Sequence, residues 1–295
     1  MQTDRDYRFE YIADLIELSE SDGVGIGEVA IRYEVQHSGF PRETVLETMR
    51  TRWNFMVQSM CEGIESPQET MGGLSRGAGE TLAAHRPALL DETTVQQMAR
   101  ALAVNECSAA MKRIVAAPTA GSSGILPSAL WGGQQRLGVP DDAVINGLFV
   151  AGAIGMVVAN NATISGAKGG CMAEVGVSTC MAAAALVEMA GGTPRQVGHG
   201  MAIALKNTLG LVCDPIGGYV EVPCIKRNAV YTVHATVAAE LALAGIESFV
   251  PPDQVVAAMK DIGDSMPRKL KETSLGGLAA TQVGLEVMSR RKSVS

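Results

Sequence analysis

Apolar residues recur every three or four positions along most of this chain, which is the spacing of one face of an α-helix. In the N-terminal third, the pattern predicts helices over residues 10–19, 27–36 and 41–63. A polar, glycine-rich connector follows over 65–79. A longer helix is expected over 93–115, with Thr94 as its N-cap and its end before Pro118, because a residue that precedes proline avoids helical angles.

The rest of the chain is more apolar and richer in glycine. It predicts further helices over 141–160, 175–190, 193–209, 228–248 and 253–265. Alternating patterns are scarce, and Tyr219–Val222 is the best candidate for a short strand. The fold class that follows is mainly α, a compact helical bundle with Gly-rich loops. We expect a single domain over 1–295, with residues 1–90 as a candidate subdomain.

Composition agrees with this fold class. Hydrophobic residues make up 47% of the chain and aromatic residues only 4%, so close packing of helices through small residues is favoured. The formal net charge is −7 and basic residues are dispersed, which argues against nucleic acid as a partner. The N-terminus lacks the apolar core of a signal peptide, and the apolar stretch 144–159 suits a buried helix better than a membrane span. We therefore expect a cytoplasmic protein that binds no membrane.

The chain contains six cysteines, which are Cys61, Cys107, Cys171, Cys180, Cys213 and Cys224. In a large cytoplasmic chain, free thiols or metal ligands are more common than disulfides. Cys61, Cys107 and Cys180 lie within helical patterns, where a free cysteine behaves as a small hydrophobic residue. The other three lie in glycine-rich loops.

Residues 116–127 form a loop of small residues with hydroxyl groups on Thr119, Ser122 and Ser123. Small residues let backbone N–H groups approach a ligand closely, so such a loop can hold a carboxylate or a phosphate. A plain glycine and proline turn explains the same composition equally well. The loop lacks the Gly-Lys-Ser/Thr ending of a nucleotide-binding P-loop.

Two later loops contain the remaining three cysteines. Cys171 comes after two glycines and leads into a predicted helix, whose N-terminus favours the thiolate over the thiol. Cys213 and Cys224 share the loop 211–228, each close to a proline. The wide spacing of the three matches neither structural zinc sites nor ferredoxin sites, so spacing alone leaves a metal site as one alternative among others.

The segments APTAGSSGILP, ISGAKGGCMAEVG and LGLVCDPIGGYVEVPCIKRNA resemble those of iron–sulfur-dependent L-serine dehydratases, over most of residues 90–290. The chain resembles the alpha subunit of the two-chain type. The resemblance implies a [4Fe–4S] cluster held by Cys171, Cys213 and Cys224. It also implies L-serine as substrate, with pyruvate and ammonia as products, a separate beta subunit as partner, and an oligomeric assembly.

Three thiolates would leave one iron open to act as a Lewis acid on the substrate hydroxyl, an arrangement similar to that of aconitase. Thr119, Ser122, Ser123 and Asn228 are the expected substrate-binding residues. Arg227 could also bind the substrate carboxylate, or pair with a surface acid.

The catalytic base is left open by the sequence. Lys168 and Glu174 are weak candidates, and Glu174 could instead orient a cluster ligand through hydrogen bonds. The four histidines (His37, His85, His199 and His234) are interpreted as surface or core residues. The resemblance implies that a serine- and histidine-containing loop of the beta subunit faces the cluster, so the base could belong to that chain.

Two other functions have some support in the sequence. A pyridoxal-phosphate serine or threonine dehydratase would use Lys168 for the Schiff base and the glycines at 121–124 for the phosphate, but the expected alternation of strands and helices is missing. A non-catalytic protein that senses redox state through its cluster is the other alternative. The hydroxyl-rich loop and the set of three ligands argue against it.

Overall fold

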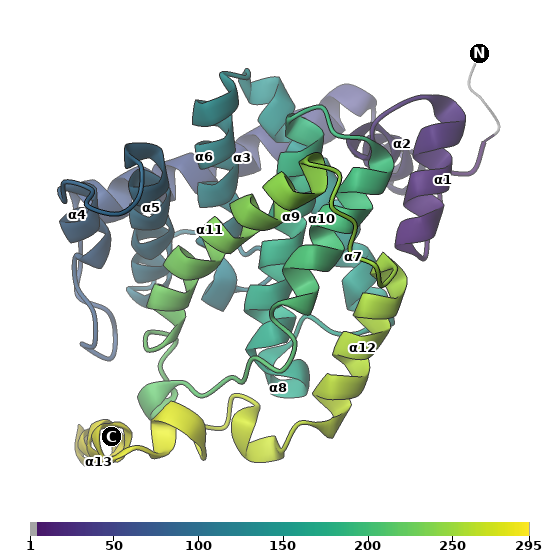
Figure 1. The fold of residues 1–295 in the computed structure, drawn as a ribbon. Coiled ribbons are helices and arrows are strands. Elements are labelled where there is room, and N and C mark those ends of the chain that lie inside the picture. The colour runs from purple at the N-terminus through teal and green to yellow at the C-terminus, as the bar shows by residue number, and fades with distance from the viewer. Residues whose placement is uncertain (1–4, 295) are drawn as a thin grey trace.

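The computed structural model describes residues 5–294, and apart from one isolated β-bridge the regular elements in this range are helical. In chain order the α-helices are α1 (Ile12–Asp22), α2 (Ile26–Ser38), α3 (Arg42–Glu65), α4 (Ala78–Ala83), α5 (Glu92–Ala109), α6 (Ile125–Leu137), α7 (Asp141–Asn161), α8 (Gly166–Gly169), α9 (Val177–Met189), α10 (Pro194–Lys206), α11 (Cys224–Leu243), α12 (Pro252–Ser265) and α13 (Gln282–Val294) (Figure 1). A π-helical turn, Met172–Gly176, leads directly into α9. The mainly α fold predicted from the sequence is confirmed.

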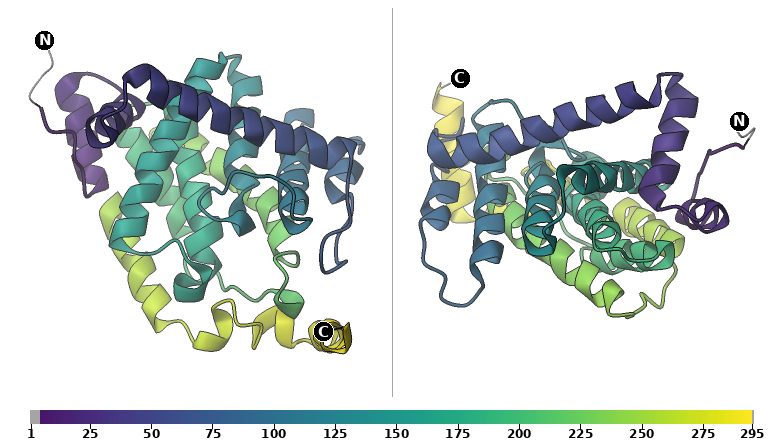
Figure 2. Two further views of the ribbon diagram at one scale, coloured as in Figure 1. Left: turned by 180° about the vertical axis from the view of Figure 1, so that it is seen from behind. Right: turned by 90° about the horizontal axis from the view of Figure 1, so that it is seen from above.

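Helix α9 is the centre of the bundle. Every residue of α9 except Glu188 is buried, and the helix packs against α6, α7, α10 and α11 (Figure 1). Ala182, Ala183, Ala184 and Ala185 are fully buried and carry only methyl groups, so the surrounding helices can approach closely. Helix α3, the longest, lies across one side of this bundle (Figure 2).

Side chains distant in sequence cap two helix N-termini. Helix α2 begins after Gly25, which has no side chain to cap it. The Glu188 carboxylate accepts hydrogen bonds from the N–H groups of Ile26 and Gly27, both at 2.8 Å, and from the Asn146 amide at 2.7 Å. Asp253 of α12 accepts in the same way from the first N–H groups of α1. These caps attach the first two helices to the core.

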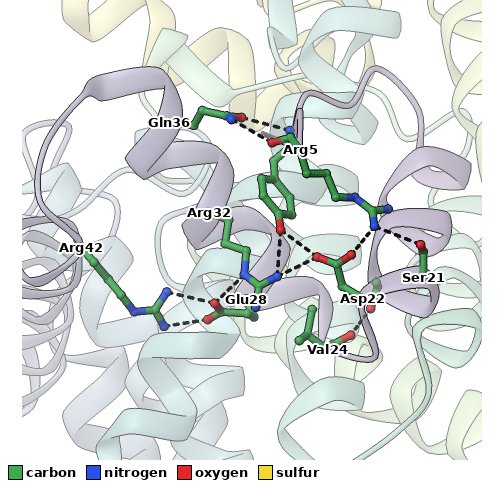
Figure 3. A network of polar contacts seen from close by, with 10 residues as sticks. Arg5, Ser21, Asp22, Val24, Glu28, Arg32, Gln36 and Arg42 are labelled. Carbon is green, nitrogen blue, oxygen red and sulfur yellow. Dashed lines mark hydrogen bonds and ion pairs between the residues drawn. The ribbon is translucent and has the colours of Figure 1, made fainter. Parts of the chain in front are cut away.

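A polar network joins the N-terminal segment to α1, α2 and α3 (Figure 3). The Asp22 carboxylate accepts from the Tyr7 hydroxyl at 2.8 Å and from Arg32 at 2.7 Å. Arg32 also pairs with Glu28, one turn earlier on α2, and Glu28 accepts from Arg42 at the start of α3. Because each charged group is shared between two elements, the network fixes how these segments meet.

A buried carboxylate also fixes the connector that precedes α4. Glu221 is 1% exposed and accepts from the Thr70 hydroxyl and from the N–H groups of Gly72 and Leu74. Since Glu221 lies between two of the loop cysteines, this connector is attached to the cysteine loop 211–228.

The helix predicted over 93–115 differs at both ends. Its N-cap is Asp91, whose carboxylate accepts from the Thr94 N–H at 3.0 Å, so Thr94 lies inside the first turn and is not the cap. The helix ends at Ala109, because Met111 adopts a left-handed φ of 60° and the chain turns away. The predicted helix therefore extended too far.

The strand predicted over Tyr219–Val222 is wrong. Gly217 and Gly218 have φ values of 64° and 75°, which curl the chain, and the Ile216 N–H bonds back to the Val222 carbonyl at 2.9 Å. The segment is thus a closed turn. Helix α6, which begins at Ile125, was not predicted, and the helix predicted over 228–248 begins four residues earlier, at Cys224.

Two helical stretches, Asp141–Asn161 and Met172–Met189, are long and apolar enough to cross a membrane. In the fold, 67% and 89% of their most apolar windows are buried inside the protein. This is the behaviour of core helices, and it agrees with the buried helix predicted over 144–159.

The cap made by Glu188 gives a stability prediction. Replacing Glu188 by Ala would leave two helix N–H groups and the Asn146 amide without their charged acceptor, and should lower the free energy of unfolding by about 3 kcal/mol. Urea denaturation followed by circular dichroism measures the change. Glu240→Ala, at an exposed position of α11, is the matched control and should change the midpoint little. Equal midpoints for the two variants would contradict the capping role.

Candidate metal centre

Three cysteines meet at one end of α9, and each comes from a different local structure. Cys171 immediately precedes the π-helical turn, Cys213 lies in the loop after α10, and Cys224 is the first residue of α11. All three are free thiols, and their exposures are 2%, 2% and 5%. The fold therefore gathers them in the interior.

Cys171, Cys213 and Glu174 form the tightest part of this group. One ligand atom from each lies within 4.8 Å of the other two, and the Cys213 Sγ donates toward Glu174 Oε2 at 3.9 Å. The Cys224 sulfur falls outside this set. Burial, together with the negative charge of Cys171, raises the pKa of Cys224 to about 12, so the third thiol is within electrostatic range of the first.

The pKa values of the thiols are shifted in different directions. A hydrogen bond from Cys213 lowers the pKa of the Cys171 thiol, and the Arg227 charge lowers it further, although burial opposes both. The same hydrogen bond, together with burial, raises the pKa of Cys213. Cys171 is thus the thiol that ionises first. Binding of a metal to all three would release protons, because the thiolate is the ligating form.

This donor set suits a soft metal. Thiolates select iron–sulfur clusters, zinc and copper(I) over hard cations. Because the Cys224 sulfur does not share the close group of Cys171 and Cys213, a centre with several metal ions spans the three better than a single ion does. The residues therefore fit an iron–sulfur cluster.

Glycine is required beside the first cysteine. Gly170 has a φ of 70°, and a Cβ at this position would lie 2.8 Å from the Leu211 carbonyl oxygen. Met172, on the other side of Cys171, donates its N–H to the same carbonyl oxygen at 3.0 Å. The loop of Cys171 can approach the loop of Cys213 because no side chain intervenes.

The C-terminal part of the chain holds Cys213 from the other side. The Cys213 N–H donates to the Leu270 carbonyl at 2.9 Å, and the Glu272 N–H donates to the Cys213 carbonyl at 2.8 Å. These two bonds make the isolated β-bridge between Cys213 and Lys271. The position of Cys213 thus depends on residues almost sixty positions later in the sequence.

The hydroxyl loop lies next to this centre. Thr119 is partly buried, hydrogen-bonds to Glu174, and lies with its hydroxyl 3.2 Å from that of Ser122. Ser122 and Ser123 are fully buried, and their hydroxyls donate to the loop carbonyls of Ala117 and Ala120. Of the three hydroxyls, that of Thr119 is the one that acts on Glu174.

Asn228 attaches the hydroxyl loop to α11. Its side chain is fully buried, accepts from the Gly124 N–H at 2.9 Å, and donates to the carbonyls of Gly121 and Cys224 at 2.9 Å each. The amide therefore has partners on both elements. It sets the distance between the loop and the turn that carries Cys224.

Two carboxyl groups face each other beside the thiols. Burial raises the pKa of Glu174, the hydrogen bond from Thr119 offsets part of that rise, and the Glu272 carboxylate adds to it. A Cβ on Gly166 would meet both carboxylates, at 2.5 Å and 3.1 Å, so they converge on that glycine. Lys168, by contrast, is exposed on the short helix α8.

The histidines of the chain have other surroundings. His37 stacks on Tyr33, His199 accepts from the Ser248 N–H, and burial lowers the pKa of His234 on α11. His85 lies with α4 residues at a surface hollow. None of these contacts involves the three cysteines.

Sequence reasoning did not identify Asp214, Glu272 or Asn105. Asp214 directly follows Cys213, and an acid next to a proposed ligand was a signal that could have been used. Glu272 is distant in sequence and gave no signal. Asn105 of α5 donates to the Ala120 and Gly121 carbonyls of the hydroxyl loop, while its buried Oδ1 has no partner.

Comparisons with known proteins agree on one family. Residues 21–279 match the model of the serine dehydratase alpha chain. A probable L-serine dehydratase alpha chain of Bacillus subtilis strain 168 is 45% identical over 95% of this chain and 94% of its own length. The L-serine dehydratase alpha chain of Peptoniphilus asaccharolyticus is 38% identical, over 93% and 95%. L-serine dehydratase 2 of Escherichia coli K12 is also 38% identical, over 92% of this chain but only 62% of its own length.

The position of Asn228 leads to a prediction on stability. Asn228→Ala leaves the buried Gly124 N–H without its acceptor and removes the bonds to the Gly121 and Cys224 carbonyls, and should lower the free energy of unfolding by about 2–3 kcal/mol. The control is Asn207→Ala, because exposed Asn207 makes a single side-chain bond, to a carbonyl of its own helix. Urea midpoints should fall clearly for the first variant and little for the second. A wild-type midpoint for Asn228→Ala would rule out the bridging role.

Proposed function

The chain belongs to the serine dehydratase alpha chain family, and we propose that it is the cluster-binding chain of an enzyme that converts L-serine to pyruvate and ammonia. The observation that supports this most strongly is the meeting of three buried cysteines beside the hydroxyl loop. We further propose that the enzyme acts in the cytoplasm and as an oligomer.

Cys171, Cys213 and Cys224 would hold a [4Fe–4S] cluster. When bound by these three thiolates, such a cluster would supply a Lewis acid for departure of the substrate hydroxyl. Glu174 contacts both Cys213 and Thr119, so it lies between the thiols and the hydroxyl loop. We propose that Glu174 orients the groups around it, whether ligand or substrate.

The net reaction places clear demands on the protein. Serine loses its α-proton and its β-hydroxyl, which gives 2-aminoacrylate and water. The enamine then becomes an imine, and water hydrolyses the imine to pyruvate and ammonia. The protein must hold the carboxylate and amino groups still, remove one proton, and keep the hydroxyl aimed at the metal centre.

We propose Thr119, Ser122, Ser123 and Asn228 as the substrate-binding set. Thr119 is the member that contacts Glu174, so it is the best placed to contact substrate. The other three side chains are bonded to backbone groups, and would act by fixing the shape of the loop. Backbone groups of this loop would then complete the contacts to the carboxylate.

The base is proposed to come from a companion chain. Within this chain Glu174 is better placed than Lys168, which is exposed on α8, and an exposed lysine is also a poor candidate for a Schiff base. The chain covers nearly all of its alpha-chain relatives but only 62% of the Escherichia coli relative. Its relatives named as alpha chains imply a companion subunit, and we propose that this subunit supplies the base.

The ligand assignment predicts the effect of single substitutions. Cys171→Ser, Cys213→Ser and Cys224→Ser should each lose most of the iron from anaerobically reconstituted protein. Cys180→Ala should retain wild-type iron, because Cys180 is enclosed in α9 and donates to the Val177 carbonyl. Iron and sulfide analysis with visible absorption measures the outcome. Loss of iron in Cys180→Ala, with retention in Cys213→Ser, would reverse the assignment.

A second prediction concerns the companion chain. The reconstituted chain alone should form pyruvate from L-serine slowly, and addition of the companion should raise kcat by about 10²-fold or more, the usual contribution of a positioned base. A coupled lactate dehydrogenase assay follows pyruvate. Full activity without a companion would place the base on Glu174 or another residue of this chain, and Glu174→Gln would then identify it.

A further inference from the structure

A buried arginine lies against the cysteine group. Arg227 is on α11, one turn after Cys224, and its side chain is 15% exposed. Its Nη1 donates to the Cys171 Sγ at 3.2 Å and to the Val212 carbonyl at 2.9 Å. Its Nη2 donates to Asp214 Oδ1 at 3.1 Å. The guanidinium is therefore engaged with protein groups and is not available as the substrate clamp considered from the sequence.

Asp214 fixes the direction of this arginine. The Asp214 side chain is only 4% exposed, and its second oxygen, Oδ2, accepts from the Leu278 N–H at 2.8 Å. A Cβ on Gly277 would lie 2.4 Å from the same oxygen, so the chain passes very close to it. Held on both sides, the carboxylate cannot turn away. The guanidinium of Arg227 is therefore held with its Nη1 directed toward the Cys171 Sγ.

The contacts of Arg227 surround one ligand and reach another. Val212 and Asp214 are the residues on either side of Cys213, and Cys171 belongs to the other cysteine loop. One guanidinium thus connects both loops and the helix that begins with Cys224. Few single residues could set the relative positions of three ligands in this way.

The charge of Arg227 matters as much as its geometry. Thiolates and the Glu174 carboxylate concentrate negative charge in a buried volume, where charges interact more strongly than in water. A guanidinium remains charged at any ordinary pH. Net charge and hydrogen bonds to sulfur set the reduction potential of iron–sulfur clusters. A cation bonded to a ligand sulfur favours the reduced, more negative form.

We propose that Arg227, aimed by Asp214, is a positioning residue that fixes the Cys171 thiolate and raises the reduction potential of the cluster. The inference rests on the cluster assigned under the proposed function. It makes no use of substrate, so it can be tested without turnover.

The test is an anaerobic redox titration of the reconstituted complex with its companion chain, followed by electron paramagnetic resonance, with iron counted in parallel. In Arg227→Gln the ratio of oxidised to reduced cluster at a fixed solution potential should rise about tenfold, which is about 59 mV for a one-electron couple. Arg227→Lys keeps the charge without the fork, and should recover part of the shift.

Lys226→Gln is the matched control, since it removes the same charge from the neighbouring, exposed position. Because solvent screens the charge of Lys226, the reduction potential of the cluster in Lys226→Gln should stay near the wild-type value. If Arg227→Gln does not assemble a cluster, Arg227→Lys decides the question, because it should still show a smaller fall in potential.

Three outcomes are distinguishable. A fall in potential for Arg227→Gln but not for Lys226→Gln supports the inference. Equal potentials in iron-loaded wild type and Arg227→Gln, or in wild type and Arg227→Lys where Arg227→Gln does not assemble, would overturn the role of Arg227 while leaving the proposed function intact. Wild-type protein that binds no iron would overturn the cluster itself, and with it this inference.

Discussion

Burial of α9 on all sides is the constraint on which the rest of the structure depends. A helix enclosed by its neighbours can carry polar groups only near its ends. At the C-terminal end of α9, the partly exposed Glu188 side chain caps the N-terminus of α2. At the other end, Cys171 and Glu174 lie before and within the π-helical turn that opens the helix. The same apolar packing that stabilises the bundle therefore collects the polar chemistry at the face where the cysteine loops meet.

Burial also explains why the cysteine site needs its polar neighbours. A buried anion is costly unless hydrogen bonds and opposite charge stabilise it. Arg227 provides both for Cys171, and Asp214 keeps the arginine in place. On the other side Thr119 donates to Glu174. The hydroxyl loop and the arginine thus support the group from opposite directions, and each is held by backbone contacts of its own.

Periodicity was sufficient to predict the helices with an apolar face, such as α1, α3 and α12, and an apolar run was sufficient for α9. Periodicity failed where a left-handed backbone conformation ends an element or turns the chain. Met111 ends α5 earlier than predicted. The left-handed glycines Gly217 and Gly218 make the segment Tyr219–Val222 part of a turn and not a strand. The three cysteines were singled out by local sequence around them, because their spacing carries no metal pattern. For Arg227 the sequence left a substrate carboxylate and a surface acid open as partners; the structure pairs it with a buried acid, Asp214, and with Cys171, and these contacts are not visible in a linear sequence. Glu272 could not be predicted for the same reason.

The pairing of Cys213 with Leu270 and Glu272, and of Asp214 with Leu278, has a consequence for biosynthesis. A ribosome delivers the chain from its N-terminus, so Cys171, Cys213 and Cys224 emerge well before the segment that holds them. Until residue 278 has left the exit tunnel, the loop that carries Cys213 lacks the backbone partners that fix it. The thiols of the growing chain are then open to oxidants and to stray metal ions. The site of the three cysteines therefore takes its final geometry only after the segment around residue 278 has been made.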